Sequence, residues 1–305
     1  MHLLRSLMFT PGQRRNMIEK ALGLGLAGPD AIMFDFEDSV PPDQKDAARD
    51  LVADALKHAP GEDGPAYIVR VNSSATGRQI ADMRAVVGPH VYAILLPKVE
   101  RPDEVIAAAM VVEDLERDAG VHRGQIGLIA AIESARGVHG VVDIATSSPR
   151  LRGLMFGAED YARDLGLPVV RTGAAWELIF ARSSLVNAAA IARLFTMDQV
   201  HMNFRDLDGE RRDAIASRSV GFSGKAAIHP SQVAVINDVF SPTSEEVEHA
   251  RAVAKAFDQA VAAGLGCVMF GGQVVEAPIL ERAQRVLRYH ETIEARRQRA
   301  ERAAA

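Results

Sequence analysis

The sequence has little cysteine, no long apolar run and no excess of basic residues, and each shortage excludes a class of protein. The single cysteine, Cys267, excludes an intramolecular disulfide and a metal site built from several thiolates. This fits a reducing compartment, and we expect a cytoplasmic protein. No apolar stretch approaches the ~20 residues that a helix needs to cross a bilayer, so no membrane partner is expected. The N-terminal segment MHLLRSLMFTPG is interrupted too soon for a secretory signal.

The charge balance argues against a nucleic-acid partner. The formal net charge is −5 and the pI is about 6.0, and the arginines are scattered except in RRQRAER near the C-terminus. With 48% hydrophobic and 25% charged residues, the composition is that of an ordinary globular protein. The 305 residues are enough for a single α/β barrel, which needs ~250.

Apolar strands and amphipathic helices alternate along the chain. The strands are apolar throughout, which indicates burial on both faces and parallel pairing. Eight such strands, each followed by a helix, predict a TIM-like (β/α)8 barrel. No GxGxxG loop follows the first strand, which disfavours a doubly wound open sheet. The predicted strands are residues 6–10, 31–36, 66–71, 93–98, 127–132, 151–157, 198–204 and 225–229.

The barrel pattern ends near residue 240. We therefore predict a catalytic barrel domain over residues 1–240 and a C-terminal helical extension over residues 241–305. Because the extension lies beyond the eighth strand, it is expected to act as a lid or as an arm that reaches a neighbouring subunit.

Two acids follow consecutive central strands, Glu133 after GLIAAI and Asp160 after LRGLMFG. In a barrel both side chains lie on the face where the strands end. Two carboxylates there, with no His or Cys close in sequence, suit a hard cation such as Mg²⁺. Helix capping would explain the same pattern, and the residues alone give the two interpretations about equal weight.

Arg70 ends an earlier strand, and a buried arginine needs anionic partners. Glu37 or Asp38 at the neighbouring strand end would provide a salt bridge. Alternatively, the guanidinium grips a carboxylate or enolate oxygen of a substrate, and both roles can coexist.

Other polar residues at strand ends have simpler interpretations. Lys98 would serve as a Schiff-base lysine or, with more weight, in charge pairing. His229 is expected to anchor a loop. Helix capping is favoured for three further acids, which are Glu159, Asp164 and Asp206. The end of the first strand carries Pro11, Gly12 and Arg14. These residues are equally compatible with pyrophosphate binding and with a simple turn.

Seven motifs occur in order along the chain: TPGQRRNMIEKA, FDFEDSV, VRVNS, LLPKVE, AAIES, FGAEDYARDLG and GFSGKAAIHPSQV. Together, over about residues 5–290, they resemble the citrate lyase β-subunit-like proteins of the HpcH/HpaI aldolase superfamily. The resemblance implies a TIM-like barrel that assembles as a homo-oligomer, a trimer or a hexamer.

The resemblance also implies a function. It predicts a lyase that cleaves or forms a citryl-, malyl- or citramalyl-CoA type of thioester, giving a 2-oxo acid and an acyl-CoA. Glu133 and Asp160 would hold Mg²⁺, and Arg70 and Glu37 would contact the substrate. Two alternatives remain, a thioester hydrolase of the malyl-CoA type and a citrate lyase β subunit that depends on an acyl carrier.

The general base is where this chain departs from its relatives. The resemblance implies an acid from the C-terminal segment of a neighbouring subunit, an aspartate in MIDMP-like motifs. This chain has VVEAP, so the matching residue is Glu276, one methylene longer. Asn203 also stands where an acid is frequent in the family. Both differences bear on the choice of reaction and substrate.

Overall fold

The computed structural model describes residues 3–61, 64–168, 175–262 and 264–304. The chain divides into two compact units, Met1–Phe240 and Ser241–Ala305. The first unit contains eight strands, which are β1 (Ser6–Pro11), β2 (Ala31–Asp35), β3 (Ala66–Arg70), β4 (Val91–Leu96), β5 (Gly127–Ile132), β6 (Leu151–Phe156), β7 (Phe195–Asp198) and β8 (Gly224–Ala227).

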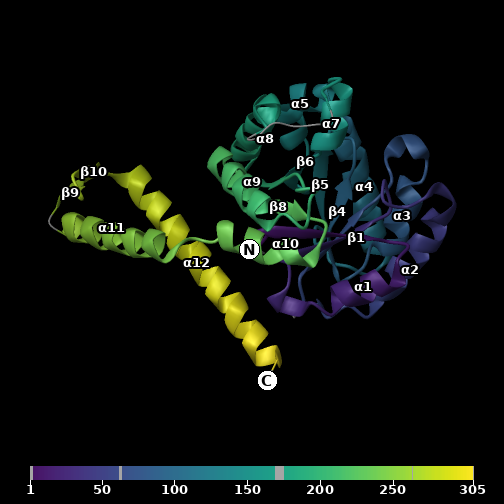
Figure 1. The fold of residues 1–305 in the computed structure, drawn as a ribbon, viewed down its shortest axis with the longest axis horizontal. Helices are drawn as coiled ribbons and strands as arrows, with labels where there is room; N and C mark the ends of the chain where they lie inside the picture. The colour runs from purple at the N-terminus through teal and green to yellow at the C-terminus, as the bar shows by residue number, and fades with distance from the viewer. Residues whose placement is uncertain (1–2, 62–63, 169–174, 263, 305) are drawn as a thin grey trace. The chain divides into compact units, whose positions relative to one another are not determined.

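These strands form a closed parallel barrel. Each pairs with the next along the chain, and β8 pairs with β1 to close the ring (Figure 1). The predicted TIM-like barrel is confirmed, and the open sheet is excluded. The helices of this unit are α1 (Arg15–Leu22), α2 (Lys45–Lys57), α3 (Gln79–Val86), α4 (Pro102–Asp118), α5 (Ala135–His139), α6 (Val141–Ala145), α7 (Ala158–Asp164), α8 (Ile179–Ala192), α9 (Leu207–Val220) and α10 (Pro230–Val239).

The period of two along each strand divides the core into two layers. Alternate side chains fill the barrel interior, where large residues such as Met33, Ile68 and Ile129 are mixed with small ones such as Ala93 and Ala226. The side chains between them point outward and pack under the helices. The strands are apolar on both faces because both faces are buried, and each fully buried Leu or Ile contributes roughly 1.5–3 kcal/mol.

The predicted seventh strand was wrong in position. Residues 198–204 were expected, but β7 is Phe195–Asp198 and the following segment is a loop. Arg193 adopts a left-handed conformation (φ 58°) and ends α8 at Ala192, so the next apolar residues are available for the sheet. The ring of Phe195 packs against Gly153 of β6, where a Cβ atom would lie 2.4 Å from it.

The second unit is a helical hairpin with a short β-ribbon. α11 (Ser244–Ala262) and α12 (Ala277–Ala304) pack on each other around Ala250, Val253 and Ala283. Between them, β9 (Val268–Phe270) and β10 (Gln273–Val275) pair antiparallel. Gly271 and Gly272 supply the two positive φ angles of a two-residue turn, which fixes this register. No helix in the described ranges is both long and apolar enough to cross a membrane.

Candidate active site

The charged residues at the carboxyl ends of β2, β3 and β5 continue the inward-facing side of their strands. Asp35, Arg70 and Glu133 each follow an interior apolar residue by two positions. Asp35 and Arg70 are also direct partners in the register of β2 and β3. The apolar interior therefore ends, at this mouth of the barrel, in a layer of opposite charges.

Arg70 is held in place by Asp35. Arg70 Nε and Nη2 donate to the two Asp35 carboxylate oxygens at 2.6 and 2.8 Å. Nη1 lies 3.1 Å from Glu37 Oε2, and the guanidinium carbon lies 5.2 Å from the centre of the Phe9 ring. Asp35 in turn accepts from the backbone N–H groups of Glu37 and Ser39, so one carboxylate fixes both the arginine and the following loop.

The charges in this layer stabilise one another. Burial by itself would raise the pKa of Asp35, but the hydrogen bonds and charge of Arg70 outweigh it and leave this pKa below its usual value. The pKa of Arg70 is raised in spite of burial because Asp35 and Glu37 surround the guanidinium. Both groups are therefore charged at neutral pH.

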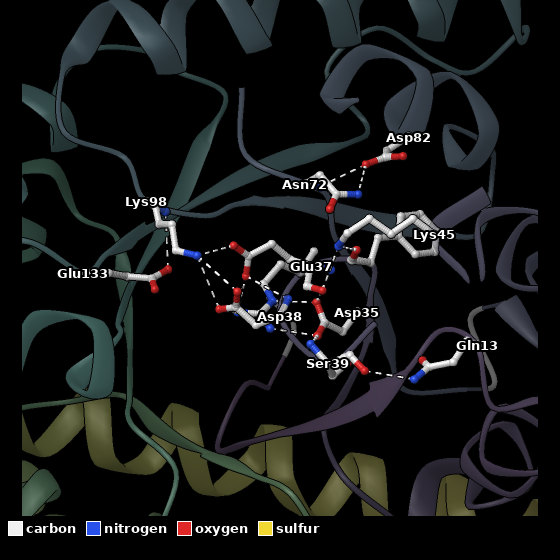
Figure 2. Close-up of polar contacts among 12 residues, drawn as sticks. Gln13, Asp35, Glu37, Asp38, Ser39, Lys45, Asn72, Asp82, Lys98 and Glu133 are labelled. Carbon is white, nitrogen blue, oxygen red and sulfur yellow. Dashed lines mark hydrogen bonds and ion pairs between the residues drawn. The ribbon is translucent and has the colours of Figure 1, made fainter. Parts of the chain in front are cut away.

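Lys98 links this layer to Glu133, as Figure 2 shows. Its Nζ donates to Glu37 Oε1 at 2.5 Å and to Asp38 Oδ1 at 3.2 Å. Its backbone N–H points to Glu133 Oε1 at 3.3 Å. Lys98 has a φ of 55°, a left-handed conformation that costs a non-glycine residue free energy and is found mostly at functional sites. Lys98 is thus charge-paired, as the sequence favoured.

Glu133 is buried beside a second carboxyl group. Burial and a hydrogen bond with Asp160 raise the pKa of Glu133 to about 8, although the charge of Arg70 opposes the shift. Gly157 at the end of β6 makes room for it, because a Cβ atom there would lie 2.3 Å from Glu133 Cγ. The predicted pair of acids on adjacent strands therefore converges.

Asp160 lies on the more open side of this pair, in the first turn of α7. Its Oδ1 forms an ion pair of 2.6 Å with Arg163 Nη2, one helical turn further on. The Asp160 side chain is 16% exposed and that of Arg163 is 76% exposed. A solvent-facing arginine thus occupies one oxygen of the outer carboxylate.

Two carboxylates form the candidate ligand set for a metal ion. Among the residues that the structure describes, no three His, Cys, Asp or Glu side chains are placed to hold an ion together. Glu133 and Asp160 offer two hard carboxylates, whose proximity penalises the doubly ionised state unless a cation or a proton is shared. Mg²⁺ suits such a pair, because it commonly binds one or two carboxylates and completes its shell with water and substrate oxygens.

The residues expected at the end of β1 support a turn. Gly12 packs against the backbone of β2, where its N–H donates to Asp35 O at 2.9 Å and a Cβ atom would lie 2.7 Å from the same oxygen. Pro11 ends β1, and Arg14 is exposed at the start of α1. Gly12 thereby fixes the first loop beside Asp35, while Arg14 faces solvent.

Several other strand-end residues have structural roles. Asp206 accepts from Gly209 N–H at the start of α9, and Asp164 accepts from Ala135 N–H at the start of α5. His229 caps α10 and stacks on Phe204, with 4.7 Å between the ring centres. The capping and anchoring roles favoured for Asp164, Asp206 and His229 are confirmed, while Glu159 and Asn203 are exposed.

Two positions remain. Glu276 belongs to the other unit, and Asp35 was not predicted from the sequence. Glu276 belongs to the second unit, where it is exposed and its carbonyl accepts from Ile279 N–H at the start of α12. Asp35 was not singled out, because the sequence pointed to Glu37 and Asp38 as the partners of Arg70. The alternation along AIMFD, which places Asp35 on the interior side, was the available signal.

The model of the family described as HpcH/HpaI aldolase/citrate lyase matches residues 5–230. The chain belongs to this family. The resemblance drawn from the seven motifs is confirmed, and the family supports a lyase.

Similar proteins agree with this assignment. The chain is 36% identical to the citrate lyase subunit beta of Haemophilus influenzae over 292 residues, which is 94% of this chain and 97% of that protein. It is also 36% identical to a (3S)-malyl-CoA thioesterase of Cereibacter sphaeroides, over 96% of this chain and 97% of the relative. A crystal structure of CitE from Mycobacterium tuberculosis with magnesium, acetoacetate and coenzyme A has a TM-score of 0.73 at 30% identity, covering 94% of this chain and 98% of that one.

Proposed function

We propose that this protein is a Mg²⁺-dependent carbon–carbon lyase. It would cleave, or form, a 3-hydroxyacyl thioester of the citryl-, malyl- or citramalyl-CoA type, with a 2-oxo acid and an acyl-CoA as the other side of the reaction. The observation that carries the proposal is the convergence of Glu133 and Asp160 beside Arg70 at the barrel mouth. Support for the substrate class comes from the CitE relative, whose structure contains magnesium, acetoacetate and coenzyme A.

Glu133 and Asp160 would hold the metal. Bound Mg²⁺ would act as a Lewis acid on the oxygens of the 2-oxo acid. Glu133 directly follows β5, Asp160 lies in the first turn of α7 after β6, and Lys98 N–H and Gly157 restrict the position of Glu133. The protein's contribution is thus a fixed pair of oxygens aimed at one point.

Arg70 would stabilise the negative charge that develops during the reaction. A guanidinium has five N–H donors, and Asp35 and Glu37 engage Nε, one N–H of Nη2 and one of Nη1. Asp38 Oδ2 lies 3.8 Å from Nη1 as well, so the second N–H of Nη2 would be the donor to a substrate oxygen. In cleavage, a base would take the 3-hydroxyl proton and the hydroxyl oxygen would become the keto oxygen of the 2-oxo acid. The electron pair of the broken carbon–carbon bond would remain on the thioester as an enolate, whose charge Arg70 would stabilise. Glu37, held by Arg70 and Lys98, would line the same wall.

Glu276 would exchange the proton at the enolate carbon. It would protonate this carbon in cleavage and remove a proton from the acyl group in the reverse direction. By resemblance to the family, we assign Glu276 of the second unit to the site of a neighbouring subunit in a homotrimer or hexamer, where residues 241–305 would form a lid over the partner's barrel of residues 1–240.

Two alternative reactions fit the same residues. Hydrolysis of the thioester is favoured by the similarity to the (3S)-malyl-CoA thioesterase. Action as the β subunit of a citrate lyase that uses an acyl carrier is favoured by the similarity to citrate lyase subunit beta. In the first, free CoA would appear without an acyl-CoA product. In the second, the isolated chain would be inactive on CoA thioesters.

The test is product analysis with the purified full-length chain. The chain is incubated with citryl-, malyl- and citramalyl-CoA, with Mg²⁺ or with EDTA, and the 2-oxo acid, acyl-CoA and free CoA are quantified. We expect lyase products that require Mg²⁺, and a loss of more than about 100-fold for Glu133→Ala, since even groups behind metal ligands cost 10–100-fold. Glu113→Gln, a half-exposed position on helix α4, is the control. Full activity of Glu133→Ala in a folded protein would refute the metal assignment.

A further inference from the structure

Arg163 is a further cation near the proposed metal ligands, and its partner differs from those of Arg70 and Lys98. Arg70 and Lys98 are engaged by Asp35, Glu37 and Asp38, which hold them in the wall. Arg163, within the described part of the chain, forms its ion pair with Asp160 instead. This cation is therefore paired with a proposed metal ligand.

The ion pair between Arg163 and Asp160 is weak enough for either residue to change its partner. It joins residues three positions apart on α7 through a side chain that is 76% exposed. Ion pairs as exposed as this one contribute little, at most about a factor of five in an equilibrium constant. A divalent cation and a guanidinium that use the same carboxylate compete for it. A cation bound by Asp160 would thus displace Arg163 at small cost.

The displaced guanidinium stays near the site. It is carried by the same helix, and its pairing distance of 2.6 Å from Asp160 shows that it reaches the ligand carboxylate. A substrate that chelates a metal on Asp160 must therefore lie within reach of Arg163. A carboxylate of that substrate that is not used in chelation would find the bidentate fork that guanidinium groups offer to carboxylates.

We propose that Arg163 is a specificity-determining residue that binds the distal carboxylate of a dicarboxylic 2-oxo acid. It is kept close by Asp160 and transferred to the substrate when the metal takes that carboxylate. A dicarboxylic acid gains this contact and a monocarboxylic acid does not. The inference rests on the proposed metal seat of Glu133 and Asp160.

The experiment is calorimetric and needs no turnover. Mg²⁺ is titrated into the full-length chain, and then oxaloacetate or pyruvate is titrated into the Mg²⁺-saturated protein. The variants are Arg163→Gln, Arg163→Lys and the control Arg136→Gln. Arg136 is a suitable control because it is also exposed, follows the adjacent strand and pairs with Glu100 rather than with a proposed ligand.

Arg163→Gln is expected to bind Mg²⁺ about two- to five-fold more tightly, because the competitor of the metal is gone. The same variant should lose most of the preference for oxaloacetate over pyruvate, about ten-fold for one charge-assisted contact. Arg163→Lys should fall between, and Arg136→Gln should match the wild type.

Either of two results would overturn the inference: Mg²⁺ affinity of Arg163→Gln no higher than that of the wild type, or an unchanged preference for oxaloacetate. Failure of the wild-type chain to bind Mg²⁺ would instead remove the proposed metal seat, and the inference with it. The wild-type titration thus separates the two failures.

Discussion

Asp35 holds Arg70 by two hydrogen bonds of 2.6 and 2.8 Å, inside the barrel and at the end where the charged site lies. A pair of the same design lies at the opposite ends of β1 and β2. There Arg5 donates through Nε and Nη2 to the two Asp30 oxygens at 2.8 and 2.9 Å. The two pairs have similar geometry and burial. Comparing variants of the two pairs therefore distinguishes the contribution of such a pair to stability from its contribution to activity.

Asp35→Asn should affect stability and activity together. Removing one partner of a buried pair leaves the other charge uncompensated, and we expect a loss of about 3 kcal/mol in the free energy of unfolding. Arg70 would also lose its fixed orientation, so kcat/KM should fall at least about 100-fold. Urea denaturation and steady-state kinetics measure the two effects.

Asp30→Asn is the matched control for that variant. It should lose a similar amount of stability while the folded protein keeps its kcat/KM. Equal kinetic losses in both variants would show that Asp35 acts only through general stability, and Arg70 would then need no orienting partner.

Activity should return when two inactive variants, one of them changed at Glu276, are mixed and exchange subunits. If the base comes from a neighbouring subunit, Glu276→Gln and Glu133→Ala chains damage different halves of a shared site. A mixture that has exchanged subunits then contains some intact sites, and about a quarter of the wild-type activity should return for random pairing of the two halves. Refolding the two variants together and assaying the product measures this.

The control mixture combines Glu133→Ala with Asp160→Ala, which damage the same half and should stay inactive. Recovery there as well would point to an artefact of refolding. An inactive mixture of Glu276→Gln and Glu133→Ala, with subunit exchange demonstrated, would place Glu276 in its own chain's site or outside catalysis.

The left-handed backbone of Lys98 predicts an unusual order of stabilities. Both Lys98→Ala and Lys98→Gly lose the Nζ contacts, but only glycine adopts a φ of 55° without strain from Cβ. In urea denaturation, the free energy of unfolding of Lys98→Gly should therefore be about 0.5–1 kcal/mol higher than that of Lys98→Ala.

Lys20, in the last turn of α1, provides the reverse case. In a helix glycine is the poorer residue, so Lys20→Gly should be less stable than Lys20→Ala. The same order at both positions would mean that the left-handed conformation at Lys98 carries no strain.

A buried carboxyl group away from the active site sets a pH dependence of stability. Glu210 in α9 accepts from Gln232 Nε2 at 2.7 Å, while its Oε1 has no hydrogen-bond partner among the residues that the structure describes. Burial raises the pKa of Glu210 to about 7, with Lys225 opposing the shift. Because the folded state holds this proton more tightly than the unfolded state, stability should decrease as the pH rises from about 4.5 to 7.

Glu210→Gln should remove this part of the pH dependence. Below pH 5 the variant and the wild type should have similar stabilities. At pH 8 the variant should be about 3 kcal/mol more stable, because the pKa rises from 4.5 to about 7 and each pKa unit corresponds to 1.36 kcal/mol. Urea denaturation at the two pH values measures the difference. An equal difference at both would show that ionisation of Glu210 is not its cause.

The barrel and part of the site were readable from the sequence, because both depend on patterns that the chain carries locally. Eight apolar runs between helices predicted the closed sheet, and acids and an arginine at strand ends pointed to Glu133, Asp160 and Arg70. The seventh strand was misplaced because the apolar residues of α8 continue into β7 without a break. The left-handed turn at Arg193 separates the two, and no glycine announces it.

Three features of the site could not be predicted from the sequence, because they depend on contacts between residues and not on local patterns. Asp35 was read as the end of an apolar strand, although the register with β3 sets it opposite Arg70. The backbone conformation of Lys98 is unusual for lysine and follows from its neighbours rather than from its own preference. The pairing of Arg163 with Asp160 depends on where α7 begins, which is the least predictable property of a helix.

Gly157 has a consequence for how other members of the family are interpreted. Glu133 fits where it does because the end of β6 has no side chain at this point. A chain that kept both acids but carried a larger residue here would have to move Glu133 away from Asp160. Such a chain would keep every charged residue of the site and still lose the geometry of the pair. Counting the acids is therefore insufficient to recognise an intact site, and the uncharged position between them must be examined as well.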